Sequence, residues 1–156
     1  DIREIKKIIS HPTLDLAACN PPYKAVGAGL RNPDERMENA RHECTCTLED
    51  VAKAGRDVLR FGGRFCLCQR PERLADAMNV FRSYGLEPKR LRLVQQRINT
   101  APSLFLLEVR RGGKPGLSVL PTLIIEDENG GFSAEMLEIY GNYKFGHEGG
   151  RADGRK

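Results

Sequence analysis

The sequence has 156 residues, 40% of them hydrophobic and 29% charged, which is typical of one soluble globular domain. No apolar run approaches the roughly 20 residues that span a bilayer, and the opening DIREIKK lacks a secretory pattern, so we expect no membrane segment. The formal net charge of +4 permits a nucleic-acid partner without requiring one.

The first third of the sequence predicts a helix, a strand, a long loop and a second helix. Isoleucines at helical spacing predict a short helix within residues 2–9, and LDLAAC (14–19) predicts a buried strand that the following prolines end. The Gly-, Pro- and Asn-rich residues 24–39 predict a long loop. Thr47 and Asp50 form an approximate capping box for a helix that Gly62 and Gly63 are expected to stop.

The remaining sequence alternates strands with helices. RFCLC (64–68) predicts a strand, Pro71 begins a helix that Gly85 ends, and RLRLVQQ (90–96) predicts a strand with basic residues on one face. SLFLLEV (103–109) is almost continuously apolar, which predicts a strand covered on both faces. The connection RINTAP predicts that these last two strands form an antiparallel hairpin at the sheet edge.

The C-terminal region predicts an extended segment at 117–126, broken by Pro121, and a short helix capped by Ser133 and stopped by Gly141. Residues 144–156 have almost no apolar content and are expected to be disordered. The alternation as a whole predicts an α/β fold with a mostly parallel sheet.

Five cysteines, an odd number without an export signal, favour reduced thiols and a cytoplasmic location. Their two C-x-C pairs differ from the C-x2-C spacing usual in zinc sites. Cys66 and Cys68 alternate within a predicted strand and therefore share one face, where we expect them to pack in the core as small apolar side chains. The sequence predicts no metal site.

The stretch Asn20-Pro21-Pro22-Tyr23 follows directly on the first predicted strand, where open α/β sheets bind ligands. Asn20 offers a side-chain carbonyl, Pro21 offers a backbone carbonyl stiffened by the two proline rings, and Tyr23 offers a face for stacking. Two acceptors and a stacking face suit a planar group that carries an NH2. A rigid turn without chemistry is the alternative, because Asn and Pro are ordinary turn residues.

The segments DLAACNPPY, ARHECTCTLEDV, GGRFCLCQRPERLAD, GLEPKRLRLV and EMLEIYG resemble the tRNA1(Val) adenine-37 N6-methyltransferase-like family, and the similarity covers nearly all of residues 1–143. The resemblance implies the C-terminal half of a class I, Rossmann-like methyltransferase fold that uses S-adenosylmethionine to methylate the N6 amine of an adenine in tRNA. It implies that Asn20 and Pro21 hold the amine, Pro22 stiffens the loop and Tyr23 stacks on the base.

The same resemblance places Asp1 and Ile2, with Asn20, on the cofactor side of the site. The sequence differs from this family in one respect. The family has a glycine-rich loop after its first strand, and this loop has no counterpart in the sequence. We therefore expect residues 1–143 to be a partial methyltransferase domain that is inactive alone and does not bind S-adenosylmethionine tightly. The strand ending in NPPY is expected to have a bare edge that favours self-association.

Basic residues predict where RNA would bind. Arg41 and His42 follow the long loop, and Lys89, Arg90 and Arg92 lie in a predicted strand, with Arg110, Arg111 and Lys114 near the next turn. A solvated basic face is the alternative. The segment Arg70-Pro71-Glu72-Arg73 belongs to the resemblance without a physical role. Two further functions stay open, namely methylation of a release-factor glutamine or of guanine N2 in ribosomal RNA, and a non-catalytic binding fragment.

Overall fold

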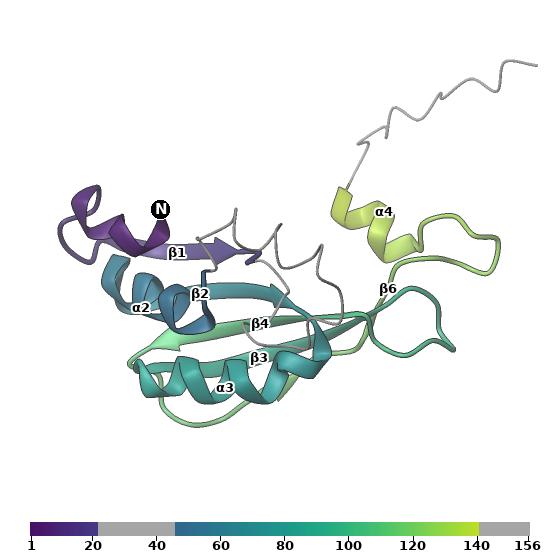
Figure 1. Cartoon of the computed structure of the whole chain (residues 1–156). Helices are drawn as coiled ribbons and strands as arrows, with labels where there is room; N and C mark the ends of the chain where they lie inside the picture. Colours follow the sequence, from purple (N-terminus) through teal and green to yellow (C-terminus); the bar gives the residue numbers. More distant parts are fainter. Residues whose placement is uncertain (22–45, 141–156) are drawn as a thin grey trace, which may run out of the picture.

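The computed structural model describes residues 1–21 and 46–140, which form one sheet with helices against it (Figure 1). The strands are β1 (Leu14–Cys19), β2 (Leu59–Gln69), β3 (Leu86–Gln95), β4 (Leu104–Arg111), β5 (Ser118–Val119) and β6 (Leu123–Ile124). The helices are η1 (Ile2–Lys7), α2 (Leu48–Val58), η2 (Pro71–Arg73), α3 (Leu74–Ser83) and α4 (Ala134–Tyr140).

The sheet has the spatial order β1-β2-β4-β3-β5, and β6 also pairs with β3. β1 and β2 are parallel, while β4 is antiparallel to both β2 and β3, so every strand except β4 runs in one direction. The predicted α/β fold and the β3–β4 hairpin are confirmed. Within the described residues the hairpin ends the run of long strands, with β4 as its inner strand, hydrogen-bonded on both edges to β2 and β3, and the two-residue strands β5 and β6 pair with the outer edge of β3.

Helices α2 and α3 lie on the same face of the sheet (Figure 1). That face carries the core, with Phe65, Phe81 and Phe105 almost fully buried. The prediction that the strand at 103–109 is covered on both faces is wrong, because Leu106 on the opposite side is 39% exposed. We call this side, opposite α2 and α3, the open face. Hydrophobic residues in β4 therefore divide between a buried face and a partly exposed one.

The capping box of α2 is confirmed. Thr47 N–H donates to the Asp50 carboxylate at 3.0 Å, and Asp50 N–H donates to Thr47 Oγ1 at 3.1 Å. The predicted end of this helix is wrong, because β2 begins at Leu59 and runs through Gly62 and Gly63.

The start of β2 is irregular because Gly62 adopts a φ of 81°. Across this point the pairing with β1 jumps from Leu14–Leu59 to Leu16–Arg64, as in a β-bulge. The glycines that suggested a helix stop therefore bend a strand. Another glycine brings helix and strand together, since a Cβ built on Gly55 of α2 would meet the Phe65 ring at 2.8 Å.

The capping box makes part of the stability of α2 dependent on pH. The hydrogen bond from Thr47 N–H is the main cause that lowers the pKa of Asp50 below its ordinary value of 3.8. Burial opposes this shift, and the hydrogen bond from the Thr47 side chain adds to it. A lowered pKa stabilises the folded state above pH 3.8, and this contribution is lost as the pH falls through the pKa of the folded state.

We expect Asp50→Asn to lower the free energy of unfolding by about 0.5 to 1 kcal/mol at pH 7, and the difference from the original chain to shrink below pH 3.8. Urea unfolding at pH 7 and pH 3 measures this. Glu49→Gln is the matched control, because Glu49 lies in the same first turn but is exposed and outside the capping box. An Asp50→Asn penalty that is equal at both pH values would contradict the prediction.

Within residues 1–21 and 46–140, β1 pairs only with β2 and so has one unpaired edge. This agrees with the bare edge expected from the sequence, while self-association through it stays a prediction. In the same part of the chain, none of the helices has the length and apolar character needed to span a membrane. The expected disordered tail at 144–156 and the helix stop at Gly141 lie outside the described residues.

Candidate functional site at the carboxyl end of β1

Asn20 is the first residue after β1, at the sheet edge where the parallel strands β1 and β2 have their carboxyl ends. The last residue of β1, Cys19, pairs with Leu67. Asn20 is exposed, whereas Pro21 is buried. The two residues therefore place an accessible side-chain amide directly before a buried proline. Pro22 and Tyr23 lie outside the described residues.

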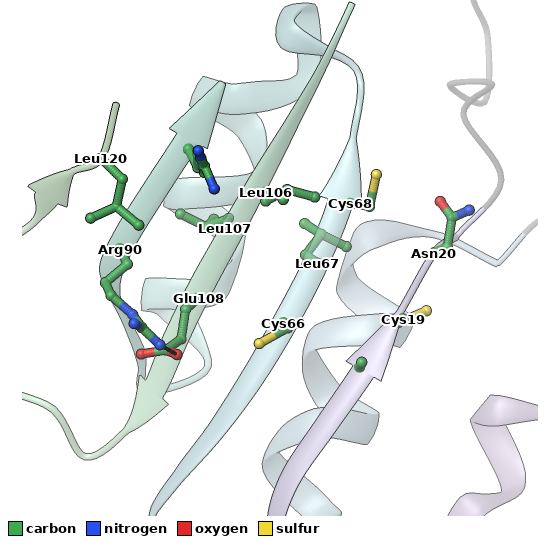
Figure 2. Close-up of a pocket in the computed structure, with 12 residues that line it drawn as sticks. Cys19, Asn20, Cys66, Leu67, Cys68, Arg90, Leu106, Leu107, Glu108 and Leu120 are labelled. Carbon is green, nitrogen blue, oxygen red and sulfur yellow. Dashed lines mark hydrogen bonds and ion pairs between the residues drawn. The ribbon is translucent and has the colours of Figure 1, made fainter. Parts of the chain in front are cut away.

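Asn20 borders a pocket of about 550 Å³ on the open face, which we call the open-face pocket (Figure 2). Side chains from four neighbouring strands contribute to it. They include Asn20, Cys66, Cys68, Arg90, Leu106 and Glu108. One pocket thus contains the amide that the sequence marked for chemistry, apolar side chains and two of the predicted RNA-binding arginines, Arg90 and Arg92.

The basic residues of β3 are held by partners within the chain. Arg90 forms an ion pair with Glu108, and this interaction raises the pKa of Arg90 (Figure 2). Arg92 pairs with Glu135 at 2.6 Å, and its Nε donates to the Pro121 carbonyl at 2.8 Å.

The third predicted cation of β3 is also engaged. Lys89 Nζ donates to the Lys114 carbonyl at 3.1 Å. Arg90 and Arg92 lie in one pocket with Asn20, whereas Lys89 is not among the residues that line it. Contact of these three cations with RNA stays a prediction, and Arg41 and His42 lie outside the described residues.

The thiols of β2 lie on the open face. Cys66 and Cys68 share one side of the strand, as predicted, but both are only half-buried and line the open-face pocket, so their predicted place in the core is wrong. The core side of β2 is taken by Phe65 and Leu67. Burial, followed by the charge of Glu108, raises the pKa of Cys66, so this thiol stays protonated at neutral pH.

Two further thiols, Cys19 and Cys46, also have raised pKa values. Burial raises the pKa of Cys19 and, as its largest cause, that of Cys46. A protonated thiol is a poor metal ligand and a poor nucleophile. Across residues 1–21 and 46–140, no cluster of three or more His, Cys, Asp or Glu side chains is arranged to hold a metal.

Asp1 and Ile2, expected on the cofactor side, do not line the open-face pocket. Asp1 caps η1 by accepting the Arg3 N–H at 3.0 Å, and its carboxylate also pairs with the Arg3 side chain. Ile2 is half-buried and packs against the core. The structure therefore gives both residues a role at the start of η1, separate from the pocket beside Asn20.

The sequence reading missed Glu108, which pairs with Arg90 and also lies 3.7 Å from Arg64. The sequence contains a signal for Glu108, because this charged residue interrupts an otherwise apolar run. It lies between Leu107 and Val109, at a position whose side chain points to the opposite face of the strand from theirs. One charged side chain in such a run marks the strand face that the core does not use. The position of Glu108 in the sequence therefore indicates the open face.

Comparison with known proteins shows the fold. No protein-family model matches the sequence, and no curated protein sequence matches it. A predicted O-methyltransferase from Agrobacterium tumefaciens superposes with a TM-score of 0.64 at 17% identity, over 89% of this chain and 59% of that one. A putative DNA modification methylase from Thermus thermophilus, complexed with S-adenosyl-L-methionine, superposes with a TM-score of 0.50 at 18% identity, over 74% and 55%.

These similarities show that the described residues have the fold of Rossmann-like methyltransferases. The chain spans less than two thirds of the length of either solved structure. In this fold, Asn20 stands at the carboxyl end of a parallel strand, which is where ligands of open α/β sheets bind.

Proposed function

We propose that this chain is part of an S-adenosylmethionine-dependent methyltransferase that methylates the exocyclic N6 amine of an adenine in tRNA. The observation that carries the proposal is the place of Asn20-Pro21, directly after β1 at the carboxyl edge of a methyltransferase fold. The resemblance of residues 1–143 supports tRNA as the substrate. A neighbour described as a DNA modification methylase supports a nucleic-acid base as the acceptor.

The proposed chemistry relies on two hydrogen-bond acceptors. The side-chain oxygen of Asn20 and the backbone oxygen of Pro21 each accept one N–H of the target amine. An amine on a heterocycle is a poor nucleophile because its lone pair is delocalised into the ring. Hydrogen bonds that hold the two N–H groups out of the ring plane would localise the lone pair on nitrogen. This lone pair would form the N–CH3 bond as the S–CH3 bond of S-adenosylmethionine breaks and S-adenosylhomocysteine leaves. One proton of the methylated amine would then pass to water, so no strong base is needed before the attack. Buried Pro21 and the following Pro22 fix the geometry in advance, and Tyr23 stacks on the base.

The described residues do not by themselves form a site that fits S-adenosylmethionine. Asp1, the carboxylate expected on the cofactor side, is engaged by Arg3, and neither Asp1 nor Ile2 lines the pocket that Asn20 borders. We therefore expect isothermal titration of this chain with S-adenosylmethionine to show no measurable binding. Tight binding by the chain alone would contradict this expectation.

The substrate is tested by radiolabelled methyl transfer from S-adenosylmethionine in the full-length protein. tRNA, ribosomal RNA and a release factor are offered in parallel, because each carries an NH2 group on a planar system. We expect label in tRNA, at the N6 position of adenine after nuclease digestion and chromatography. Label only in the release factor, or only at guanine N2, would replace the proposed substrate. The isolated chain serves as the control and is expected to transfer no label.

A further inference from the structure

Arg70 is the first residue after β2, just as Asn20 is the first residue after β1. Because Cys19 pairs with Leu67 in a parallel ladder, Asn20 is level with Cys68, and Arg70 lies two residues further along the neighbouring strand. With strands about 4.8 Å apart and a rise of about 3.3 Å per residue, the Cα atoms of Asn20 and Arg70 are roughly 8 Å apart. An extended arginine side chain is long enough to span most of this distance.

The backbone at Arg70 is held in place from both sides. Its N–H donates to the side-chain oxygen of Gln69 at 2.9 Å, and Gln69 is only 3% exposed. Pro71 then opens η2 at its first position, which holds Arg70 in an extended conformation with φ −75° and ψ 145°. The exposed Arg70 side chain therefore projects from a rigid point at the carboxyl edge of the sheet.

The arginines of β3 contribute to the structure of the sheet itself. Arg90 is paired with Glu108, and Arg92 is paired with Glu135 and is largely buried, with a side-chain exposure of 20%. Arg70 differs from both in its place in the fold, because it lies beyond the end of its strand, on the strand next to the one that Asn20 follows.

We propose that Arg70 binds a phosphate of the RNA strand whose adenine is held at Asn20. This inference rests on the proposed function and names a binding residue for it. Phosphate contacts fix the register of a nucleic acid on a protein, and the planar guanidinium of arginine suits the geometry of a phosphate. The contact would orient the strand so that one base reaches the two acceptors of Asn20 and Pro21. It gives a role to the Arg70-Pro71-Glu72-Arg73 segment that the sequence alone left without one.

The test is direct binding of a fluorescent single-stranded RNA oligonucleotide with one adenine in a pyrimidine run, measured by anisotropy between 50 and 200 mM salt. We expect Arg70→Ala to weaken binding by about 5- to 10-fold and to reduce the slope of log Kd against log salt by about 0.7, the value for one phosphate contact to a single strand. Arg70→Lys keeps the charge and should keep the slope. Arg70→Gln retains a long side chain without the charge and should show the same weaker binding and reduced slope as Arg70→Ala. It serves as a second test if the alanine variant folds poorly.

Arg82→Ala is the matched control, because it removes one positive charge at the far end of α3, where Arg82 lies 3.2 Å from Glu87. Equal weakening by Arg82→Ala and Arg70→Ala would overturn the inference, since it would reduce the effect to net charge. Unchanged binding in Arg70→Ala would also overturn it. Wild-type chain that fails to bind RNA at 50 mM salt would overturn the inference irrespective of methyl transfer. Arg70-dependent RNA binding together with label only in a release factor would refute the proposed substrate and leave the RNA contact standing.

Discussion

Replacing Asn20 with Leu in the full-length protein is expected to lower kcat/KM for methyl transfer to tRNA by about 10²- to 10³-fold. Leucine has nearly the same size but no acceptor, so one hydrogen of the target amine loses its partner in the transition state. Losses of this size follow the removal of a single preorganised hydrogen-bonding group from an active site. Because Asn20 is exposed, its replacement should leave the fold intact. Steady-state transfer of labelled methyl groups gives the measurement.

Asp15→Asn is the control for this experiment. Asp15 lies on the same strand but near its other end, is exposed, and pairs with Arg60 at the surface, where an ion pair contributes little to stability. The control should methylate tRNA as the original protein does. If Asn20→Leu retained activity within a few-fold of that level, the Asn20 side chain would not hold the amine, and the proposed chemistry would have to be abandoned.

Replacing Phe81 with Ala is expected to lower the free energy of unfolding by about 3 to 5 kcal/mol. Phe81 on α3 is fully buried, and its ring lies 5.5 Å from that of Phe65 on β2, so its loss leaves a cavity between the helix layer and the sheet. Domains of this size are stable by only about 5 to 15 kcal/mol, so the variant is expected to be near its unfolding midpoint in mild urea. Urea unfolding followed by circular dichroism measures the loss.

Phe61→Ala is the matched control, because Phe61 is 78% exposed and the same atoms are removed without a buried cavity. We expect a loss below about 0.5 kcal/mol for it. Phe81→Leu, which fills most of the site, should cost a fraction of the alanine penalty and remains measurable if the alanine variant is unfolded. Equal losses for Phe61→Ala and Phe81→Ala would contradict the one-sided core described above.

Local sequence signals predicted the elements that depend on local physics. Residues 14–19 form the strand that their apolar run predicted, and Thr47 and Asp50 form both hydrogen bonds of the capping box. Ser133 also caps α4, because the N–H of Met136 donates to its hydroxyl at 3.2 Å. In each case the partners lie within a few residues of one another, so the sequence contains the whole interaction.

The predictions that are wrong concern features that depend on contacts between residues far apart in sequence. Gly62 and Gly63 predict a helix stop. In the structure the N–H of Thr13 bonds to the Val58 carbonyl and Leu14 pairs with Leu59, so a strand starts before the glycines are reached. A glycine ends a helix or bends a strand according to what lies beside it, and the neighbouring strand here is about 45 residues away in sequence.

The candidate site shows the same difference between interactions of neighbouring residues, which could be predicted, and contacts of residues far apart in sequence, which could not. The position of Asn20 directly after a strand could be predicted from the sequence, whereas its role in chemistry stays a prediction. The pairing of Arg90 with Glu108 could not, because it depends on β4 being inserted next to β3 in a particular register. The half-exposed position of Cys66 and Cys68 could not be predicted either, since it depends on which face α2 and α3 cover.

The insertion of β4 between β2 and β3 has a consequence for how the chain folds. Among the residues that the structure describes, β2 and β3 do not bond to each other, so the ladders of β4 join the part of the sheet containing β1 and β2 to the part containing β3, β5 and β6. The β3–β4 hairpin needs only a short loop to close, whereas β2 pairs with β4 across some 40 residues. Closing the shorter loop costs less entropy, so the hairpin is expected to form first and then add to β2 as a unit. The amide hydrogens of β4, bonded on both sides, should accordingly be among the slowest in the chain to exchange with solvent.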